Sequence, residues 1–255
     1  MAPDSHRPII GLTVELLQAP EYTGRRRFQL FPEYLECLRE AGAHPVLLPS
    51  DPTSEQQATE IPAILDLLDG LLLTGGDDPD LRLLGGPEPL ELCKPIPEAQ
   101  QRSCLAYLQE AQRRKMPVLG ICLGMQLMGL AEGAPFHQHL SQGGHEKGAR
   151  HGVQPIPGSL LADVLGSATR FEILSYHHQA LADTGPGLLA CGHADDGLLE
   201  AVEWPDHPFG LGVQWHPERT PQSRSSRRLF SSFCRAAKIY HHRRVQGETA
   251  RGSAW

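Results

Sequence analysis

The stretch MPVLGICLGMQ, residues 116–126, places a cysteine between two glycines at the end of an apolar segment. The apolar residues predict a buried strand, and the residues after Cys122 predict a helix. Such a cysteine has two interpretations. It packs in a core as a small hydrophobic residue, or it is a nucleophile that a tight strand-to-helix turn exposes and orients, as in the Gly-x-Ser-x-Gly elbow. Its position at the end of the strand favours the nucleophile.

Strands and helices alternate on the N-terminal side of this turn. The order is strand 7–14, helix 32–43, strand 44–49, helix 61–68, strand 69–76, helix 97–115 and strand 116–122. This alternation predicts an α/β fold with a central, mostly parallel sheet and helices on both faces. In such sheets ligands bind beyond the carboxyl ends of the strands, where Cys122 and the pair Gly75-Gly76 fall.

The C-terminal half changes character. Residues 187–204 read as two strands around an Asp-Asp-Gly turn, and residues 209–215 read as a third strand. Their close spacing predicts antiparallel pairing. The final residues carry no periodicity, so we expect a disordered tail over residues 241–255. Since no interdomain linker is visible, we expect a single domain over residues 8–240.

Composition narrows the classes of function. The formal net charge of −7 argues against a nucleic-acid partner. The apolar stretches fall far short of the ~20 residues of a membrane helix, and we expect no signal peptide. Six cysteines without metal-knuckle spacing favour reduced thiols and a cytoplasmic location. We expect a small-molecule substrate and no cofactor, and we allow for a homodimer.

The segment GVQWHPE, residues 212–218, offers what a cysteine nucleophile requires. A thiolate needs a base, and the base needs an orienting group. Residues two apart in extended backbone point the same way, so we expect Glu218 to accept a hydrogen bond from His216. The other imidazole nitrogen would then serve Cys122. A strand-ending turn is the alternative interpretation of His-Pro-Glu, and the accompanying elbow disfavours it.

Stabilising a developing negative oxygen requires two backbone N–H groups. Leu123, at the start of the predicted helix, supplies one. The pair Gly75-Gly76 is a candidate for the other because its backbone can approach a ligand closely, although on its own the pair fits a simple turn better.

Together these motifs resemble the class I glutamine amidotransferase superfamily. GICLGMQ, GVQWHPE and the Thr-Gly-Gly at 74–76 match its Cys-His-Glu pattern. SYHHQAL, residues 175–181, is similar to the γ-glutamyl-γ-aminobutyrate hydrolase branch, which is grouped with the peptidase C26 enzymes. The resemblance spans residues 8–240 and implies a single-domain, flavodoxin-like fold with a small antiparallel C-terminal portion.

The resemblance also implies roles for individual residues. Cys122 would be the nucleophile, His216 the base and Glu218 its orienting group, with Gly76 and Leu123 as the oxyanion hole. The glutamyl group would be held by Gln126 and by the backbone of Ser175, Tyr176 and His177. The implied reaction is hydrolysis of a γ-glutamyl amide, such as γ-glutamyl-γ-aminobutyrate, through a cysteinyl thioester, in polyamine catabolism.

Departures from the branch pattern lie in the loops expected to surround the leaving group. Leu174 stands where the branch has Asn, and residues 133–138 read GAPFHQ in place of Gly-Gly-Thr-Leu-x-Gln. Leu174 and Phe136 predict a more apolar wall around the leaving group, but the identity of the leaving amine is not determined. Two other functions also stay open: a glutaminase subunit that delivers ammonia to a separate synthase, and a catalytically silent regulatory module.

Histidines crowd the same region, at positions 137, 139, 145, 151, 177 and 178. They lack the fixed local spacing of a metal motif such as His-Glu-x-x-His. We therefore expect polar loop residues near the site entrance and no metal. The arginines within 224–228 predict a solvated helix face.

Overall fold

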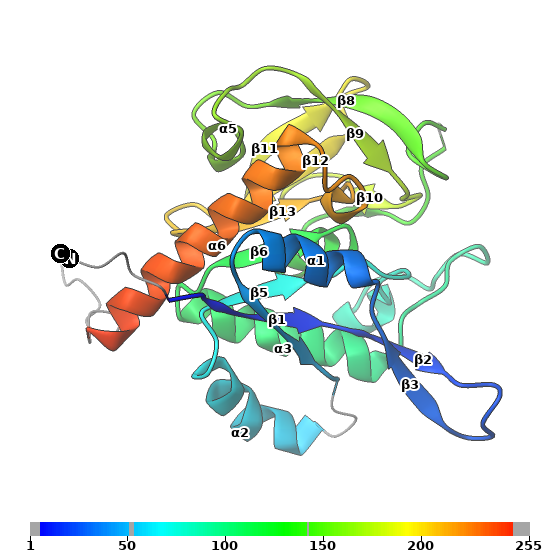
Figure 1. Ribbon diagram of the computed structural model, residues 1–255. Coiled ribbons are helices and arrows are strands. Elements are labelled where there is room, and N and C mark those ends of the chain that lie inside the picture. The colour runs from blue at the N-terminus through cyan, green and yellow to red at the C-terminus, as the bar shows by residue number, and fades with distance from the viewer. Residues whose placement is uncertain (1–5, 51–53, 142, 247–255) are drawn as a thin grey trace.

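A nine-stranded mixed sheet organises the chain, in the order β4-β1-β5-β6-β13-β12-β11-β8-β9 (Figure 1). The computed structural model describes residues 6–50, 54–141 and 143–246. The strands of this sheet are β1 Ile9–Thr13, β4 His44–Leu48, β5 Gly70–Leu73, β6 Val118–Ile121, β8 Ala149–Pro155, β9 Phe171–Ser175, β11 Leu189–Ala194, β12 Leu199–Glu203 and β13 Gly210–Val213.

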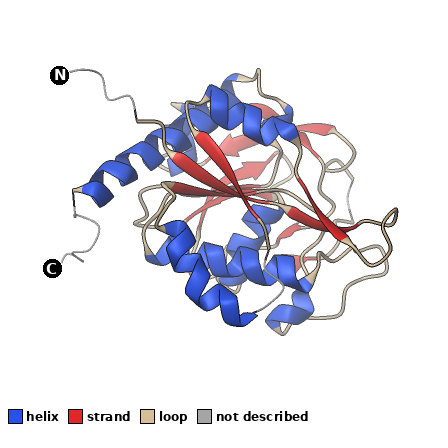
Figure 2. Cartoon of the chain, turned by 60° about the horizontal axis from the view of Figure 1, so that its bottom comes forward, coloured by secondary structure: helices blue, strands red, loops and turns tan. Residues whose placement is uncertain are grey.

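Helices cover both faces of the sheet, as predicted (Figure 2). They are α1 Pro32–Glu40, α2 Ser54–Leu65, α3 Glu98–Arg113, α4 Leu123–Ala131, α5 Leu160–Leu165 and α6 Arg224–Val245, with 3₁₀ turns η1 Leu81–Leu84 and η2 Pro217–Arg219. Successive side chains of β5 point to opposite faces of the sheet. Leu72 packs in the hydrophobic cluster on one face, and Leu71 and Leu73 pack in the cluster on the other. No described helix combines the length and apolar character needed to cross a membrane.

The strand directions confirm the predicted pairings and add one that was not predicted. β4, β1, β5 and β6 pair in parallel, and β11 pairs antiparallel with β12, as expected. β13 is antiparallel to β12 but parallel to β6, so the third C-terminal strand joins the two parts of the sheet. Its register sets Val213 opposite Ile121, which brings the residues after both strands to the same edge.

Three further pairs of strands were not predicted from the sequence. β8 and β9 complete the antiparallel end of the main sheet. β2 Glu15–Gln18 and β3 Arg26–Gln29 form a hairpin that projects from the body (Figure 1). β7 Phe136–His137 pairs with β10 Ala180–Leu181 near the predicted site.

The C-terminal helix is longer than predicted. α6 continues to Val245, so residues 241–245 are helical and not a tail; residues 247–255 lie outside the described part of the chain. Helical spacing of the buried residues Phe233, Ala237 and Tyr240 carries the helix along the sheet. At its start Arg224 and Arg227 are exposed, which confirms the predicted solvated face.

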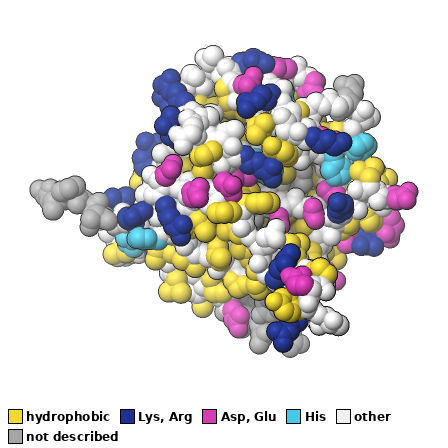
Figure 3. Space-filling model, turned by 45° about the vertical axis from the view of Figure 1, so that its right-hand side comes forward, with side chains coloured by type: hydrophobic (Ala, Val, Ile, Leu, Met, Phe, Trp, Pro, Cys, Tyr) yellow, Lys and Arg dark blue, Asp and Glu magenta, His cyan; other side chains and the backbone are white. Residues whose placement is uncertain are grey.

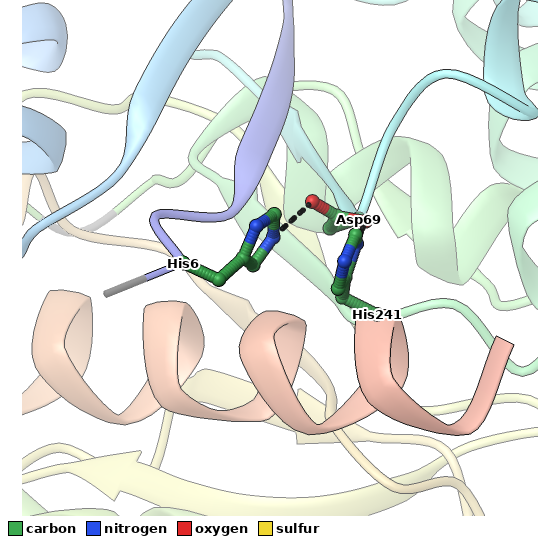
Figure 4. A group of neighbouring side chains, drawn as sticks. All are labelled: His6, Asp69 and His241. Carbon is green, nitrogen blue, oxygen red and sulfur yellow. Dashed lines mark hydrogen bonds and ion pairs between the residues drawn. The ribbon is translucent and has the colours of Figure 1, made fainter. Parts of the chain in front are cut away.

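Asp69, fully buried just before β5, ties both ends of the described chain to the sheet (Figure 4). Its carboxylate accepts hydrogen bonds from the Ile9 N–H and from Arg244, each at 2.9 Å. It also lies 3.2 Å from His6 Nε2 and 2.8 Å from His241 Nδ1, and these two rings stack at 3.5 Å between centroids. One buried charge therefore holds the start of β1 and the end of α6.

We expect Asp69→Ala to lower the free energy of unfolding by roughly 2–4 kcal/mol, because it leaves several donors at a buried position without an acceptor. Urea unfolding measures this loss. The matched control is Asp66→Ala, which removes a 70% exposed carboxylate paired with Arg114. We expect that variant to lose at most about 1 kcal/mol. Equal losses at the two positions would contradict the role of Asp69.

Candidate active site

Cys122 occupies the turn between β6 and α4 with a backbone φ of 51° and ψ of −104°. A positive φ is rare for a residue with a side chain, so the surroundings impose this conformation. The flanking glycines explain how. A Cβ at Gly124 would collide with the Leu73 carbonyl, and a Cβ at Gly120 would collide with Gly124. Because glycine has no Cβ, α4 packs directly on the sheet and Cys122 is held at the strand ends.

His216 and Glu218 lie at the same edge of the sheet. The Cys122 N–H donates to the Val213 carbonyl at 2.8 Å, so the segment after β13 runs beside the cysteine. A Cβ on Gly75 would lie 2.7 Å from the His216 ring and 3.5 Å from the Cys122 Cβ. His216 Nδ1 lies 2.6 Å from Glu218 Oε1. The structure therefore brings the three predicted side chains together.

The contact between His216 and Glu218 is as predicted, but its backbone cause differs. We expected extended backbone, in which residues two apart share a face. The chain instead turns after His216 into η2, which begins at Pro217. The proline fixes its own φ near −65°, a value that suits the start of a helical turn.

Neighbouring charges raise the pKa of His216. Burial alone would lower this pKa, but the neighbouring Cys122 sulfur and the Glu218 carboxylate outweigh burial and raise the pKa to about 10. Hydrogen bonds to both partners act in the same direction. The site therefore favours the imidazolium form of His216 at neutral pH.

Gln214 is a buried member of the site that the sequence analysis did not identify. Its Nε2 lies 3.6 Å from the Cys122 sulfur, and its Oε1 accepts a hydrogen bond from Gln126 Nε2 at 3.3 Å. An N–H donor directed at sulfur stabilises negative charge there. Gln214 stands two residues before His216, and residues two apart in a strand lie on the same face. This spacing is the sequence signal that indicates Gln214.

Tyr34 on α1 is the second group that was missed, and no local pattern indicates it. Its buried hydroxyl accepts a hydrogen bond from the Gly75 N–H at 3.0 Å and lies near Glu218. Burial, followed by the charge of Glu218, raises the pKa of Tyr34 well above its ordinary value. Tyr34 thus stays a neutral phenol and engages one N–H of the glycine pair.

Gly76 and Leu123 meet beside the cysteine. A Cβ at Gly76 would lie 3.0 Å from Leu123 Cδ2, and Gly76 lines the cavity over Cys122. Leu123 is the first residue of α4, where a backbone N–H has no acceptor within its own helix. Because the Gly75 N–H already donates to the Tyr34 hydroxyl, Gly76 is the candidate of the pair for donating to a ligand.

A cavity of about 640 Å³ opens over Cys122. Three loops line it with mostly polar and charged residues: Asp77, Asp78, Leu92 and Lys94; His139, Glu146 and Lys147; and Tyr176, His177, His178 and Gln179. Acidic and basic side chains are also interspersed on the molecular face that Figure 3 presents. Gln126 lines the cavity from α4.

One expectation about this cavity needs correction, and the role of the Ser175 backbone stays a prediction. The Ser175 side chain is buried and its hydroxyl donates to the His145 carbonyl at 2.6 Å, while Tyr176 and His177 line the cavity. The expectation that Leu174 and Phe136 form part of the cavity wall is wrong, because neither lines the cavity. Leu174 belongs to the β8–β9 ladder, and Phe136 pairs with β10 and packs against the core.

Carboxyl groups crowd one side of the cavity. Burial, followed by the charge of Asp78, raises the pKa of Asp77, and Lys94 acts in the opposite direction. Burial and then Asp77 raise the pKa of Glu15 on β2. Carboxylates that repel one another at a cavity wall provide a favourable place for a cationic group of a ligand.

Comparisons with known proteins agree on the kind of protein. A family model described as peptidase C26 matches residues 8–218. A Mycobacterium tuberculosis protein named "putative glutamine amidotransferase" is 36% identical over 253 residues, covering 95% of this chain and 79% of that protein. The γ-glutamyl-γ-aminobutyrate hydrolase of Escherichia coli O157:H7 is 30% identical over 258 residues, covering 93% and 95%.

A solved structure shows the same fold at lower sequence identity. The glutaminase domain of Trypanosoma brucei CTPS, which holds bound acivicin, aligns with a TM-score of 0.63 at 18% identity. The alignment covers 91% of this chain and 94% of that one. The mixed sheet with helices on both faces is therefore the class I glutamine amidotransferase fold.

The charges around His216 lead to a titration experiment. In protein labelled with ¹⁵N-histidine, we expect His216 to lose its proton near pH 10, and at a lower pH in Glu218→Gln, because one raising charge is gone. Since the folded pKa lies above the unfolded value of ~6.5, the bound proton stabilises the fold fully below pH 6.5, and this contribution is lost as the pH rises through about 10. NMR titration that places His216 near 6.5 in the unmodified chain would contradict the argument.

Proposed function

This chain belongs to the peptidase C26 family, and we propose that it hydrolyses a γ-glutamyl amide to glutamate and a free amine through a thioester at Cys122. The observation that carries the proposal is the grouping of Cys122, His216 and Glu218 at a cavity of about 640 Å³. The thiol, the raised pKa of its neighbouring imidazole and the buried carboxylate are what nucleophilic catalysis by cysteine requires.

Each group has one task in the proposed reaction. The Cys122 sulfur attacks the amide carbon and forms the C–S bond, and the backbone N–H groups of Gly76 and Leu123 stabilise the developing oxyanion. The His216 imidazolium gives its proton to the nitrogen as the C–N bond breaks. Water then attacks the thioester, His216 takes a proton from that water, and glutamate leaves as the thiolate is restored. Gln214 supports the thiolate by its N–H contact.

The glutamyl end is proposed to bind between α4 and the loop after β9. Both N–H groups of the Gln126 amide are engaged, by the carbonyl of Gln179 and by Gln214, which leaves its Oε1 as an acceptor for a ligand. The Ser175 carbonyl accepts from the Gly148 N–H and retains a second lone pair. Gln126 and Asp77 both line the cavity, and these acceptors suit the α-ammonium of a glutamyl group, with the Ser175 carbonyl next to the lining residue Tyr176.

The leaving-group side suits a charged amine better than the aliphatic stem expected from the sequence. Asp78 is engaged on both oxygens, by His178 at 3.0 Å and by the Lys94 N–H at 2.7 Å. The side chains of Lys94 and Lys147 are the cations of the lining. A leaving amine that ends in a carboxylate, as γ-aminobutyrate does, would pair with them.

A glutaminase subunit is the second candidate function. Its support is the name of the Mycobacterium tuberculosis relative, at 36% identity over 95% of this chain. Both functions use the same acyl-enzyme chemistry, so they differ in the fate of the nitrogen and in the need for a synthase partner. The presence of Cys122, His216 and Glu218 in contact argues against a silent regulatory module.

We expect Cys122→Ala to lower kcat/KM for γ-glutamyl-γ-aminobutyrate by at least ~10³-fold, because no nucleophile remains to form the thioester. Glutamate release measures the rate. Stoichiometric labelling by a glutamine-mimicking electrophile should disappear in the same variant. The control is Cys93→Ala, since that thiol lies in a cavity loop and its contacts are with Gln138 and Gln179 rather than with His216. Normal turnover by Cys122→Ala would refute the thioester, and a folded chain that is neither labelled nor active would favour the silent module.

A panel of γ-glutamyl amides separates the two enzymatic functions. We expect γ-glutamyl-γ-aminobutyrate to be cleaved better than γ-glutamylbutylamine, and both better than glutamine, because a longer amine gains contacts that ammonia cannot make. Lys147→Ala should raise KM for the carboxylate-bearing substrate by about 2–5-fold, which is the size of one exposed ion pair. It should leave the butylamide unchanged. Glutamine as the best substrate, or activity only with a second protein, would favour the glutaminase subunit.

A further inference from the structure

Histidines gather around one buried carboxylate beside the substrate cavity. Glu200 on β12 is fully buried, and its Oε1 lies 3.2 Å from His145 Nδ1, 3.4 Å from His177 Nε2 and 3.1 Å from His151 Nε2. The His145 and His177 side chains are at most 5% exposed. Within the described ranges, every group at ion-pair distance from Glu200 is an imidazole.

His145 and His177 each have one ring nitrogen that faces Glu200 and one that faces away from it. The hydrogen bond of the nitrogen that faces away determines whether the nitrogen toward Glu200 carries a proton. His145 Nε2 lies 2.9 Å from the Asp196 carboxylate, and His177 Nδ1 lies 2.9 Å from the Gln179 carbonyl. Both acceptors require an N–H, so in the neutral rings His145 Nδ1 and His177 Nε2 carry lone pairs. These two atoms and Glu200 Oε2 are buried without a hydrogen-bond partner. Lone pairs that face a carboxylate repel it unless a cation lies between them.

The spacing of these atoms fits a metal ion. Ligand atoms of His145, His177 and Glu200 all lie within 4.8 Å of one another. Tetrahedral zinc with ligands at about 2.0–2.1 Å has ligand-to-ligand separations of about 3.3–3.4 Å. The separations of 3.2 and 3.4 Å from Glu200 Oε1 match this value. A carboxylate and a carbonyl on the outer nitrogens are the usual partners of metal-binding histidines.

We propose that His145, His177 and Glu200 form a binding site for a zinc ion, with water in the fourth position of the tetrahedron. His151 lies beside the site, with its Nε2 3.1 Å from the Glu200 carboxylate and its Nδ1 3.3 Å from the Gly144 carbonyl. This departs from the expectation of no metal, which rested on spacing along the chain. The ligands come from positions 145, 177 and 200, which only folding brings together.

A second cluster of the same residue types provides a contrast (Figure 4). His6 and His241 flank Asp69, and their ligand atoms also lie close together. There, however, the carboxylate already accepts hydrogen bonds from Arg244 and from the Ile9 N–H. A guanidinium at 2.9 Å repels a metal cation and supplies the positive charge that Asp69 needs. The Glu200 cluster has no such cation among the described residues.

The ion would hold the loop that contacts the substrate. The His145 carbonyl accepts hydrogen bonds from the Ser175 hydroxyl and the His177 N–H, so ligation of His145 and His177 joins two segments that are already in contact. Tyr176 lies between Ser175 and His177 and lines the cavity. Resting on the proposed function, metal removal should therefore raise KM more than it lowers kcat, because Cys122 and His216 lie on other elements.

Metal binding by the full chain tests the proposal without any turnover assay. Protein is freed of metal with a chelator, checked by elemental analysis, and titrated with Zn²⁺ by calorimetry and with Co²⁺ by visible absorption. We expect one equivalent of each, a tetrahedral cobalt spectrum without a thiolate charge-transfer band, and a higher Tm in the zinc-loaded chain. The variants His145→Ala and Glu200→Gln should lose at least ~10-fold in affinity. The control His193→Gln, which changes a histidine of the adjoining surface pocket, should bind as the unmodified chain does.

Two results would overturn the zinc site. A folded, unmodified chain that binds neither Zn²⁺ nor Co²⁺ with saturation would mean that a proton on one imidazole balances Glu200. Full binding in both His145→Ala and Glu200→Gln would place the ion elsewhere. The cobalt spectrum of the unmodified chain reports its ligands directly, so the test stands even where a variant does not fold. Because no result depends on amide hydrolysis, failure here is distinct from failure of the proposed function.

Discussion

The parallel pairing of β6 with β13 is the constraint on which the site depends. The two strands lie about ninety residues apart in the chain, yet their register sets Val213 opposite Ile121, so both end at one edge. The hydrogen bond from Cys122 to Val213 then fixes the strained turn beside the segment that carries His216. Glycines before and after Cys122 permit this, because any larger residue would push α4 off the sheet.

Buried carboxylates lie beside imidazoles at three places in the described part of the chain. Glu218 contacts His216, Glu200 is surrounded by histidines, and Asp69 lies between two stacked histidines. A buried carboxylate is costly unless it is paired, and imidazole pairs with it while still responding to its neighbours. The neighbouring groups distinguish these carboxylates: Cys122 and Glu218 raise the pKa of His216, and Arg244 pairs with Asp69 near the end of α6.

Local pattern predicted most of the N-terminal architecture. Alternating apolar strands and amphipathic helices indicated the parallel part of the sheet and placed Cys122 at its end. Pattern failed where partners are distant or the periodicity is weak. The parallel pairing of β13 depends on β6, which lies far away in the chain. The strands β8 and β9 gain their apolar face only by joining the sheet. The end of α6 is held by Asp69. Short strands carry too few residues to show which neighbour they join.

The sequence by itself determined the elements of the site that lie within a few residues of one another. Flanking glycines mark the turn at Cys122, and the spacing of His216 and Glu218 places them in contact, because sterics and short chain separation act before the fold is complete. Tertiary structure alone decided the rest: Tyr34 binds the Gly75 N–H, Gln214 reaches the Cys122 sulfur, and Glu200 meets histidines from two other segments. These contacts depend on strand register and on burial, and neither exists until distant segments have packed together.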